Sequence, residues 1–256
     1  MKRVHNIVRR ALQQAVRWGW LTENPAVHAS PPRTQRVEPT APTPDEMSRL
    51  LTAATDADPA FGTFIRLAAV TGARRGELCG LRWNAVDLDA GSVLISRSVV
   101  RGEDGLVNKD TKTHQARRVA IDAATRHALA AHHTQCLERA LQCGVRLAPN
   151  AFVFSYEASG VKPWPPLSVS QRFRRLRDQA GITHVRLHDL RHYAATRLVA
   201  GGVPVRTVSG RLGHANAATT LGIYSHFVEA SDQAAADLLG ELLDGAPDAP
   251  PAIARP

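Results

Sequence analysis

Residues 187–227 read LHDLRHYAATRLVAGGVPVRTVSGRLGHANAATTLGIYSHF, and this stretch decides how the rest of the chain is interpreted. Its apolar residues recur at helical spacing, which predicts a run of three short helices. Gly201 and Gly202 form a stop for the first helix, and Pro204 suits the first turn of the second. Helices of this kind hold polar side chains at fixed offsets.

The polar residues of this stretch form an ordered set. His188 and Arg191 are three residues apart, so on a helix they project from one face. His214 follows the second helix, and Asn216 is placed to cap a third helix that carries Tyr224 near its end. Together these groups suit phosphoryl transfer to a tyrosine. Each one alone has a common structural explanation: a satisfied or capping histidine, or a tyrosine in a core or an interface.

Composition narrows the class of partner. The net charge is +9 and the pI is about 10.3, which favours nucleic acid or an anionic membrane surface. The basic residues are mostly arginine, which suits bidentate phosphate contacts, although a GC-rich genome also explains part of the excess. No apolar run approaches the roughly 18 residues of a membrane span.

Three cysteines without paired spacing predict neither a disulfide framework nor a zinc motif; they are Cys79, Cys136 and Cys143. Met1 leads into a basic amphipathic stretch rather than a signal peptide. A protein of the reducing cytoplasm is therefore expected.

The pattern along the chain predicts four segments. Residues 1–28 contain one helix, over 2–20, whose apolar stripe needs a partner. Residues 29–42 are proline-rich and predict an extended linker. Residues 43–243 form the compact domain, and residues 244–256 a disordered tail.

Helical and strand periods alternate within the compact domain. Thr43 and Glu46 form a capping box at its first helix. The period changes from helical to extended between residues 92 and 121. The expected fold class is mainly α with a small antiparallel β-sheet (α+β). The other predicted elements are helices over 59–71, 74–81, 123–143, 168–180 and 231–243 and a short strand over Phe152–Phe154.

Two further stretches carry candidate chemistry. Arg74 lies just past the helix stop at Gly72, where it could reach a phosphate, and Glu77 is close enough to orient its guanidinium. A surface arginine beside a helix-start glutamate is the structural alternative. Lys112, at the tip of a strand–turn–strand, could swing towards DNA and protonate a leaving oxygen, unless the turn is simply solvated.

Taken together, these motifs resemble the tyrosine recombinase (phage integrase) family over about residues 43–243. The matching stretches are TGARRGELCGLRW (71–83), TKTHQARRV (111–119), LHDLRHYAATRL (187–198), GRLGH (210–214) and TTLGIYSHF (219–227). The resemblance implies the catalytic-domain fold of that family and a site-specific recombinase or integrase. Such an enzyme cuts and rejoins DNA through a 3′-phosphotyrosine without metal, ATP or another cofactor.

The resemblance also assigns roles to residues. Tyr224 would be the nucleophile and Glu77 a supporting acid. The catalytic pentad would be Arg74, Lys112, His188, Arg191 and His214. Expected partners are double-stranded DNA and sibling protomers in a DNA-bound tetramer, with neither a membrane nor a small-molecule substrate.

Further arginines are candidates for contacts with the DNA backbone, or else belong to solvated faces; they are Arg9, Arg10, Arg17, Arg172, Arg174, Arg175 and Arg177. Residues 1–28 resemble only the last helix of the DNA-binding domain that precedes the linker in this family. The chain is therefore expected to be an N-terminally shortened member that holds DNA weakly. A DNA-binding remnant of a mobile element with little activity, or a strand-relaxing activity like that of type IB topoisomerases, are the alternatives.

Overall fold

The computed structural model describes residues 2–30, 41–103, 105–110 and 116–213. Contacts divide the chain into two compact units, Met1–Pro39 and Thr40–Pro256. Several predicted segments lie outside the described residues: most of the linker, the helix capped by Asn216, the helix over 231–243 and the tail.

The first unit holds one helix and a returning turn. α1 spans Lys2–Arg17 and ends earlier than predicted, because Gly19 adopts a left-handed conformation with φ 74°. Asn24 caps the short 3-10 helix η1 (Pro25–Val27). Its amide nitrogen also donates to the carbonyl of Arg9 at 2.9 Å, which holds the turn against α1.

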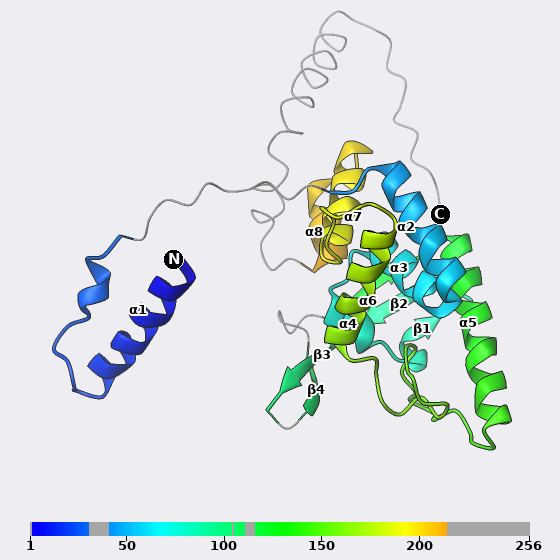
Figure 1. Cartoon of the computed structure of the whole chain (residues 1–256), viewed down its shortest axis with the longest axis horizontal. Coiled ribbons are helices and arrows are strands. Elements are labelled where there is room, and N and C mark those ends of the chain that lie inside the picture. The colour runs from blue at the N-terminus through cyan, green and yellow to red at the C-terminus, as the bar shows by residue number, and fades with distance from the viewer. Residues whose placement is uncertain (1, 31–40, 104, 111–115, 214–256) are drawn as a thin grey trace, which may run out of the picture. The chain divides into compact units, whose positions relative to one another are not determined.

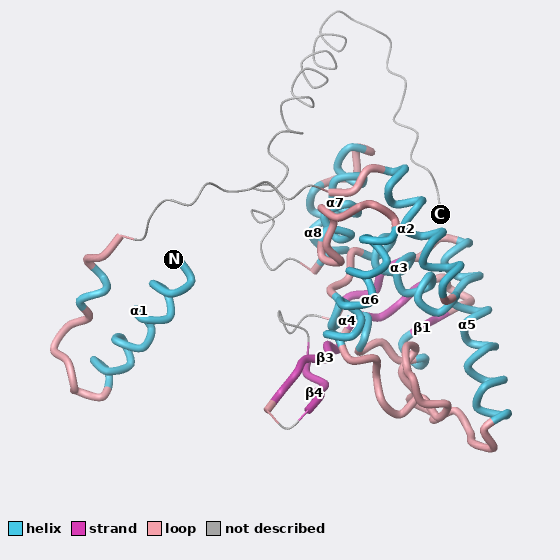
Figure 2. The backbone as a smooth tube through the Cα atoms, in the orientation of Figure 1, coloured by secondary structure: helices cyan, strands magenta, loops and turns pink. Residues whose placement is uncertain are grey.

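The second unit is mainly helical with short antiparallel strands, which confirms the predicted fold class (Figures 1 and 2). Its helices are α2 (Pro44–Ala57), α3 (Pro59–Thr71), α4 (Arg75–Cys79), η2 (Trp83–Ala85), α5 (Ala123–Gln142), α6 (Pro166–Gln179), α7 (Asp189–Ala200) and α8 (Val205–Leu212). Its strands are β1 (Val86–Asp87), β2 (Ser92–Ile95), β3 (Arg97–Gly102), β4 (Gly105–Asp110) and β5 (Arg117–Ala120). No helix in the described part of the chain is long and apolar enough to cross a membrane.

Local signals set the ends of the first helices as predicted. The Thr43 hydroxyl accepts from the Glu46 amide at 3.2 Å, and the Glu46 carboxylate accepts from the Thr43 amide at 2.8 Å. Asp58 caps the start of α3. Gly72 ends α3 in the left-handed conformation, with φ 61°, and so turns the chain towards Arg74.

α3 is the central helix of the second unit, and it contacts α2, α4, α5 and α7. Its buried aromatic side chains meet those of a distant loop. The ring centroids of Phe64 and Phe154 are 5.0 Å apart, and those of Phe64 and Trp164 are 6.0 Å apart. Burying each such side chain contributes about 1.5–3 kcal/mol, so this cluster fixes α3 as a rigid base.

The strands form two small antiparallel groups. β1, β2 and β5 make one sheet, whereas β3 and β4 form a hairpin that projects from the helices (Figure 1). Within β5 the exposure alternates, so that Arg117 and Val119 face inward while Arg118 faces solvent.

The predicted strand over Phe152–Phe154 is wrong. Phe152 makes only an isolated bridge with Arg82, and the segment belongs to no ladder. Its backbone hydrogen bonds go to three separate segments, at Leu81, Gly160 and Trp164. The apolar run reflects burial on all sides of a loop, which sequence pattern alone does not separate from a buried strand.

Phe64→Ala should lower the free energy of unfolding by about 3–5 kcal/mol, because it removes the ring at the centre of the aromatic cluster. Urea unfolding followed by circular dichroism measures this. Leu141→Ala is the matched control, since Leu141 is 80% exposed on α5. Equal stabilities for the two variants would contradict the central position of Phe64.

Candidate functional site

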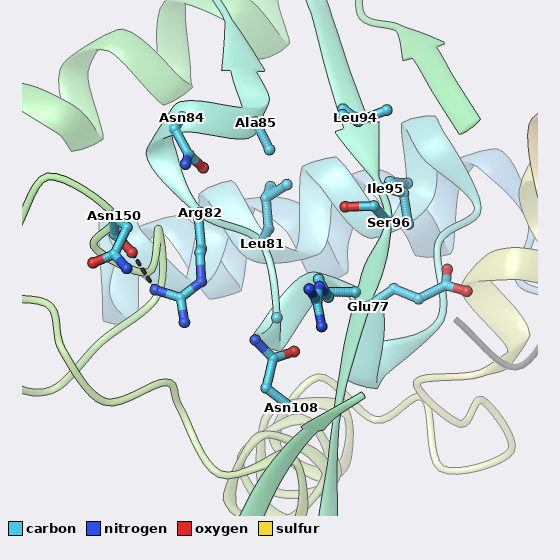
Figure 3. Close-up of a pocket in the computed structure, with 12 residues that line it drawn as sticks. Glu77, Leu81, Arg82, Asn84, Ala85, Leu94, Ile95, Ser96, Asn108 and Asn150 are labelled. Carbon is cyan, nitrogen blue, oxygen red and sulfur yellow. Dashed lines mark hydrogen bonds between the residues drawn. The ribbon is translucent and has the colours of Figure 1, made fainter. Parts of the chain in front are cut away.

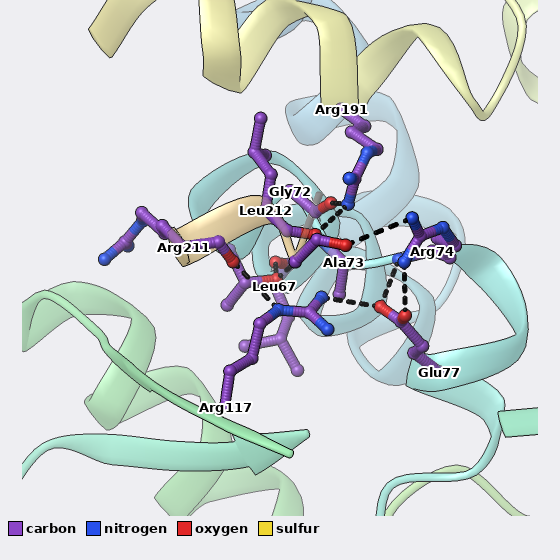
Figure 4. Close-up of polar contacts among 11 residues, drawn as sticks. Leu67, Gly72, Ala73, Arg74, Glu77, Arg117, Arg191, Arg211 and Leu212 are labelled. Carbon is purple, nitrogen blue, oxygen red and sulfur yellow. Dashed lines mark hydrogen bonds and ion pairs between the residues drawn. The ribbon is translucent and has the colours of Figure 1, made fainter. Parts of the chain in front are cut away.

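The candidate site is built around the carboxyl end of α8. The last carbonyl groups of a helix lack intrahelical partners, and cationic side chains stabilise them. Three guanidinium groups from three separate segments approach this end (Figure 4). The pairs are Arg117 Nε to the carbonyl of Arg211 (2.9 Å), Arg191 Nη1 to that of Leu212 (2.6 Å) and Arg74 Nη2 to that of Gly213 (3.4 Å). We refer to these pairs as the arginine clamp.

Of the two clamp arginines that belong to the predicted pentad, Arg74 and Arg191, Arg191 is the more deeply buried. Arg191 is 5% exposed, and its Nη1 also donates to the carbonyl of Gly72 at 2.7 Å. The packing there requires glycine, since a Cβ on Gly72 would lie 2.3 Å from the Leu212 side chain. Arg191 therefore joins the ends of α3 and α8 from its place on α7.

Glu77 connects the other two arginines. It is 2% exposed, and its carboxylate accepts from Arg74 Nη1 at 2.8 Å and from Arg117 Nη2 at 2.6 Å. Burial alone would raise the pKa of Glu77, but hydrogen bonds and charge from Arg117, together with Arg74, outweigh it and lower the pKa. The predicted contact between Glu77 and Arg74 is confirmed. Glu77 also stands in the first turn of α4, and the Arg74 side chain is partly exposed, so a surface arginine beside a helix-start glutamate describes the same local geometry.

His188 lies at the start of α7, where Arg74 and Arg191 act on it electrostatically. Partial desolvation of its ring lowers the pKa of His188. The neighbouring His192 and the two arginines lower it further, against the opposing charge of Asp189. The lowered pKa favours the neutral imidazole, which is the form that can accept a proton.

A groove of about 1080 Å³ runs past Arg74 and His188, between the β3–β4 hairpin and the amino-terminal part of α6. Four cationic side chains line it, against two carboxylates. The cations are Arg74, Arg75, Arg101 and Lys109, and the carboxylates are Glu103 and Asp110. The groove offers an elongated anionic molecule access to Arg74.

A second pocket, of about 410 Å³, has Glu77 among its lining residues (Figure 3). Polar groups of Arg82, Asn84 and Asn108 line it, and the Glu77 carboxylate extends away from them.

Across the described ranges no three histidine, cysteine, aspartate or glutamate side chains cluster as a metal site would need.

The predicted DNA-contact arginines differ in their surroundings. On α6, Arg172 pairs with Asp58 at 2.7 Å and covers the ring of Phe61, and Arg177 donates to the carbonyl of Val185, so both hold the fold together. The exposed members are Arg174 and Arg175 on α6 and Arg9, Arg10 and Arg17 on α1.

The structure thus brings together Arg74, Glu77, His188 and Arg191. Lys112, His214 and Tyr224 lie outside the described residues. Sequence reasoning missed Arg117, although it stands in the quoted stretch 111–119. The signal was the period-two pattern of β5, which puts Arg117 on the same inner face as Val119 and so demands a buried acidic partner.

Residues 42–230, more than half of the chain, match the model of the phage integrase family. The chain belongs to this family of tyrosine recombinases. It is 32% identical to the tyrosine recombinase XerD of Caulobacter vibrioides, over 85% of this chain and 68% of that protein. It is 29% identical to a XerC-like tyrosine recombinase of Caldanaerobacter subterraneus subsp. tengcongensis, over 69% of this chain and 48% of that protein.

Among solved structures, the Tn1549 transposon integrase in complex with circular intermediate DNA has the same fold. The TM-score is 0.72 at 20% identity, and the match covers 93% of this chain and 80% of that one. The chain spans about half to two thirds of the length of the first curated relatives that it matches.

Glu77→Gln should lower the free energy of unfolding at pH 7 by about 3–5 kcal/mol, because it leaves buried guanidinium charge uncompensated. The pKa of Glu77 is lower when folded, so its contribution is present above the ordinary value of 4.5 and is lost as pH falls through the folded value. Denaturant unfolding between pH 7 and pH 3 measures both effects. Glu138→Gln is the control, because Glu138 is exposed. If Glu77→Gln lost as much free energy of unfolding between pH 7 and pH 3 as the wild type, Glu77 would not be the group responsible for the acid sensitivity.

Proposed function

We propose that the chain acts as a site-specific DNA recombinase that cuts and rejoins DNA through a covalent 3′-phosphotyrosine. The supporting observation is the convergence of Arg74, Glu77, His188 and Arg191, of which Arg74 and His188 line the groove. The stretch that matches the family also contains the other residues that this chemistry needs, Lys112, His214 and Tyr224.

Two arginines would hold the reacting phosphate. A guanidinium presents a planar fork of donors that matches the non-bridging oxygens of a phosphodiester. Arg74 lines the groove, whereas Arg191 is buried against the carbonyls of Gly72 and Leu212. A bound phosphate would compete with these carbonyls for Arg191. The two arginines would then stabilise the negative charge that grows on the two oxygens.

Tyr224 would attack the phosphorus, forming the tyrosyl–phosphate bond and breaking the bond to the 5′-oxygen. His188 accepts the phenolic proton, and Lys112 donates a proton to the leaving 5′-oxygen. His214 adds a further donor to the phosphate. Because the phosphotyrosine bond conserves the energy of the broken phosphodiester, religation to a second strand needs no ATP.

Double-stranded DNA is the proposed substrate, lying along the groove. The exposed Arg174 lies seven residues after the groove-lining Leu167, so on α6 both face the same way. Contacts of this kind bind phosphates without reading sequence and weaken as salt rises. Assembly of sibling protomers on DNA is part of the same proposal. The Tn1549 relative of the same fold was solved with DNA, which supports DNA as the partner.

Tyr224→Phe should abolish covalent attachment to DNA while leaving gel-shift binding unchanged. The substrate library consists of random-sequence duplexes with a single nick. Cleavage near the nick releases a short fragment, which diffuses away and cannot be rejoined. Complexes that survive sodium dodecyl sulfate are counted, and their DNA is sequenced. The exposed Tyr156, changed to Phe, is the matched control. Attachment that survives in Tyr224→Phe would rule out the proposed nucleophile. If all DNA-dependent effects survive, the DNA-binding remnant becomes the better account, and relaxation of supercoiled DNA without a site would favour the topoisomerase alternative.

The rate of covalent attachment should be flat at neutral pH and fall as pH drops through a midpoint below 6.5, the ordinary pKa of histidine. The base needs neutral His188, and its lowered pKa moves the loss of rate to more acidic pH. His188→Gln should reduce the rate about 10²-fold and remove this acid limb, measured in single-turnover assays. The exposed His127, changed to Gln, should keep the wild-type profile; a limb that persists in His188→Gln belongs to another group.

A further inference from the structure

Arg117 makes contacts that the proposed chemistry does not use. Its Nη2 pairs with Glu77 at 2.6 Å, and its Nε donates to the carbonyl of Arg211 at 2.9 Å. Figure 4 shows the guanidinium lying between these two partners. A single planar group thus ties β5 both to the carboxylate that orients Arg74 and to the end of α8.

The surroundings of Arg117 fix it in place. Its side chain is 8% exposed, and it enters from the inner face of β5, beside the buried Val119. β5 is paired with β2 along its whole length, and α8 packs against β5. Arg117 is absent from the lining of the groove, which Arg74 does line. A phosphate in the groove would therefore engage Arg74 and leave the contacts of Arg117 intact.

Gly213 is shaped to fit against Arg117. It has φ 69°, and a Cβ there would lie 2.8 Å from Arg117 Nη1. This Nη1 is buried and has no hydrogen-bond partner among the described residues. Only glycine adopts this positive φ readily and also leaves the space that the guanidinium occupies. The guanidinium of Arg117 therefore defines where the chain leaves α8. The next residue is His214, and Tyr224 lies ten residues further on.

We propose that Arg117 is a positioning residue for the nucleophilic segment, an inference that rests on the proposed function. When the phosphate draws Arg74 away from the carbonyl of Gly213 and Arg191 away from that of Leu212, Arg117 keeps its hydrogen bond to the carbonyl of Arg211. The carboxyl end of α8 then stays in register with Glu77 while the two phosphate ligands turn to the substrate. Arg117 acts through this geometry, and it is not among the residues that line the groove.

The chemistry of the side chain decides which variants are informative. Lysine keeps a positive charge beside Glu77, but its single ammonium does not reproduce the rigid fork that reaches Glu77 and Arg211 together. Glutamine removes the charge as well. Misplacement of a reacting group by about 1 Å costs up to about 10²-fold in rate, whereas binding depends on phosphate contacts elsewhere.

The test uses the full chain and a duplex selected by covalent capture, and it separates the DNA Kd from the single-turnover rate of covalent attachment. Arg117→Gln should lower the rate about 10–100-fold at unchanged Kd, and Arg117→Lys should retain part of it. Arg118→Gln makes the same charge change at the exposed neighbour and should react like the wild type. Val119→Ala, in the same strand, shows what loss of stability alone does to the rate below its Tm.

The outcomes are distinguishable. A wild-type chain that forms no covalent complex overturns the proposed function and this inference with it. If the wild type reacts, the inference alone fails when Arg117→Gln matches Arg118→Gln, when Val119→Ala loses as much rate, or when the whole loss is in Kd. Should Arg117→Gln not fold, Arg117→Lys and Gly213→Ala replace it, because a Cβ on Gly213 would displace the guanidinium; a wild-type rate in both would overturn the inference.

Discussion

Three successive carbonyl groups at the end of α8 depend on arginines from the segment before α4, from β5 and from α7. A helix end buried without such partners would be costly, because its carbonyls could not reach water. The arginine clamp removes this cost and, in the same contacts, brings together segments far apart in the sequence. Through Arg74 and Arg117 the clamp also contacts the buried Glu77, and through Arg191 it includes α7.

The arginines that stabilise the end of α8 include the two that are proposed to bind the reacting phosphate. Arg74 and Arg191 satisfy protein carbonyls with the donors that a phosphodiester would take. When a phosphate binds, its oxygens would replace protein carbonyls as the acceptors of these arginines, so no guanidinium would be left without a partner before or after binding. Arg117 differs from both, because its carboxylate and carbonyl partners lie away from the groove. In the proposed mechanism, this separation would allow Arg74 and Arg191 to bind the substrate while Arg117 keeps α8 in register with Glu77.

Much of the fold follows from local sequence signals, because each acts within a few residues. The capping box at Thr43 and the glycine stop at Gly72 are of this kind, and both form as predicted. The contact between Arg74 and Glu77 was predictable for the same reason, since the two are three residues apart. The contact of Glu77 with Arg117 spans forty residues and depends on strand pairing that no local pattern specifies. The strand predicted over Phe152–Phe154 was wrong for a related reason: its backbone hydrogen bonds go to the distant Leu81 and to Gly160 and Trp164 in the following loop, and these do not form a ladder.

The side chains of the arginine clamp offer the most direct test of this account. Nitrogen-15 spectra of the arginine Nε–H groups in the full chain, recorded with and without the selected duplex, report each guanidinium separately. The signals of Arg74 and Arg191 should shift on binding, while that of Arg117 should stay in place and stay protected from exchange with water. Unchanged signals from Arg74 and Arg191 in a DNA complex, or a shift confined to Arg117, would contradict it.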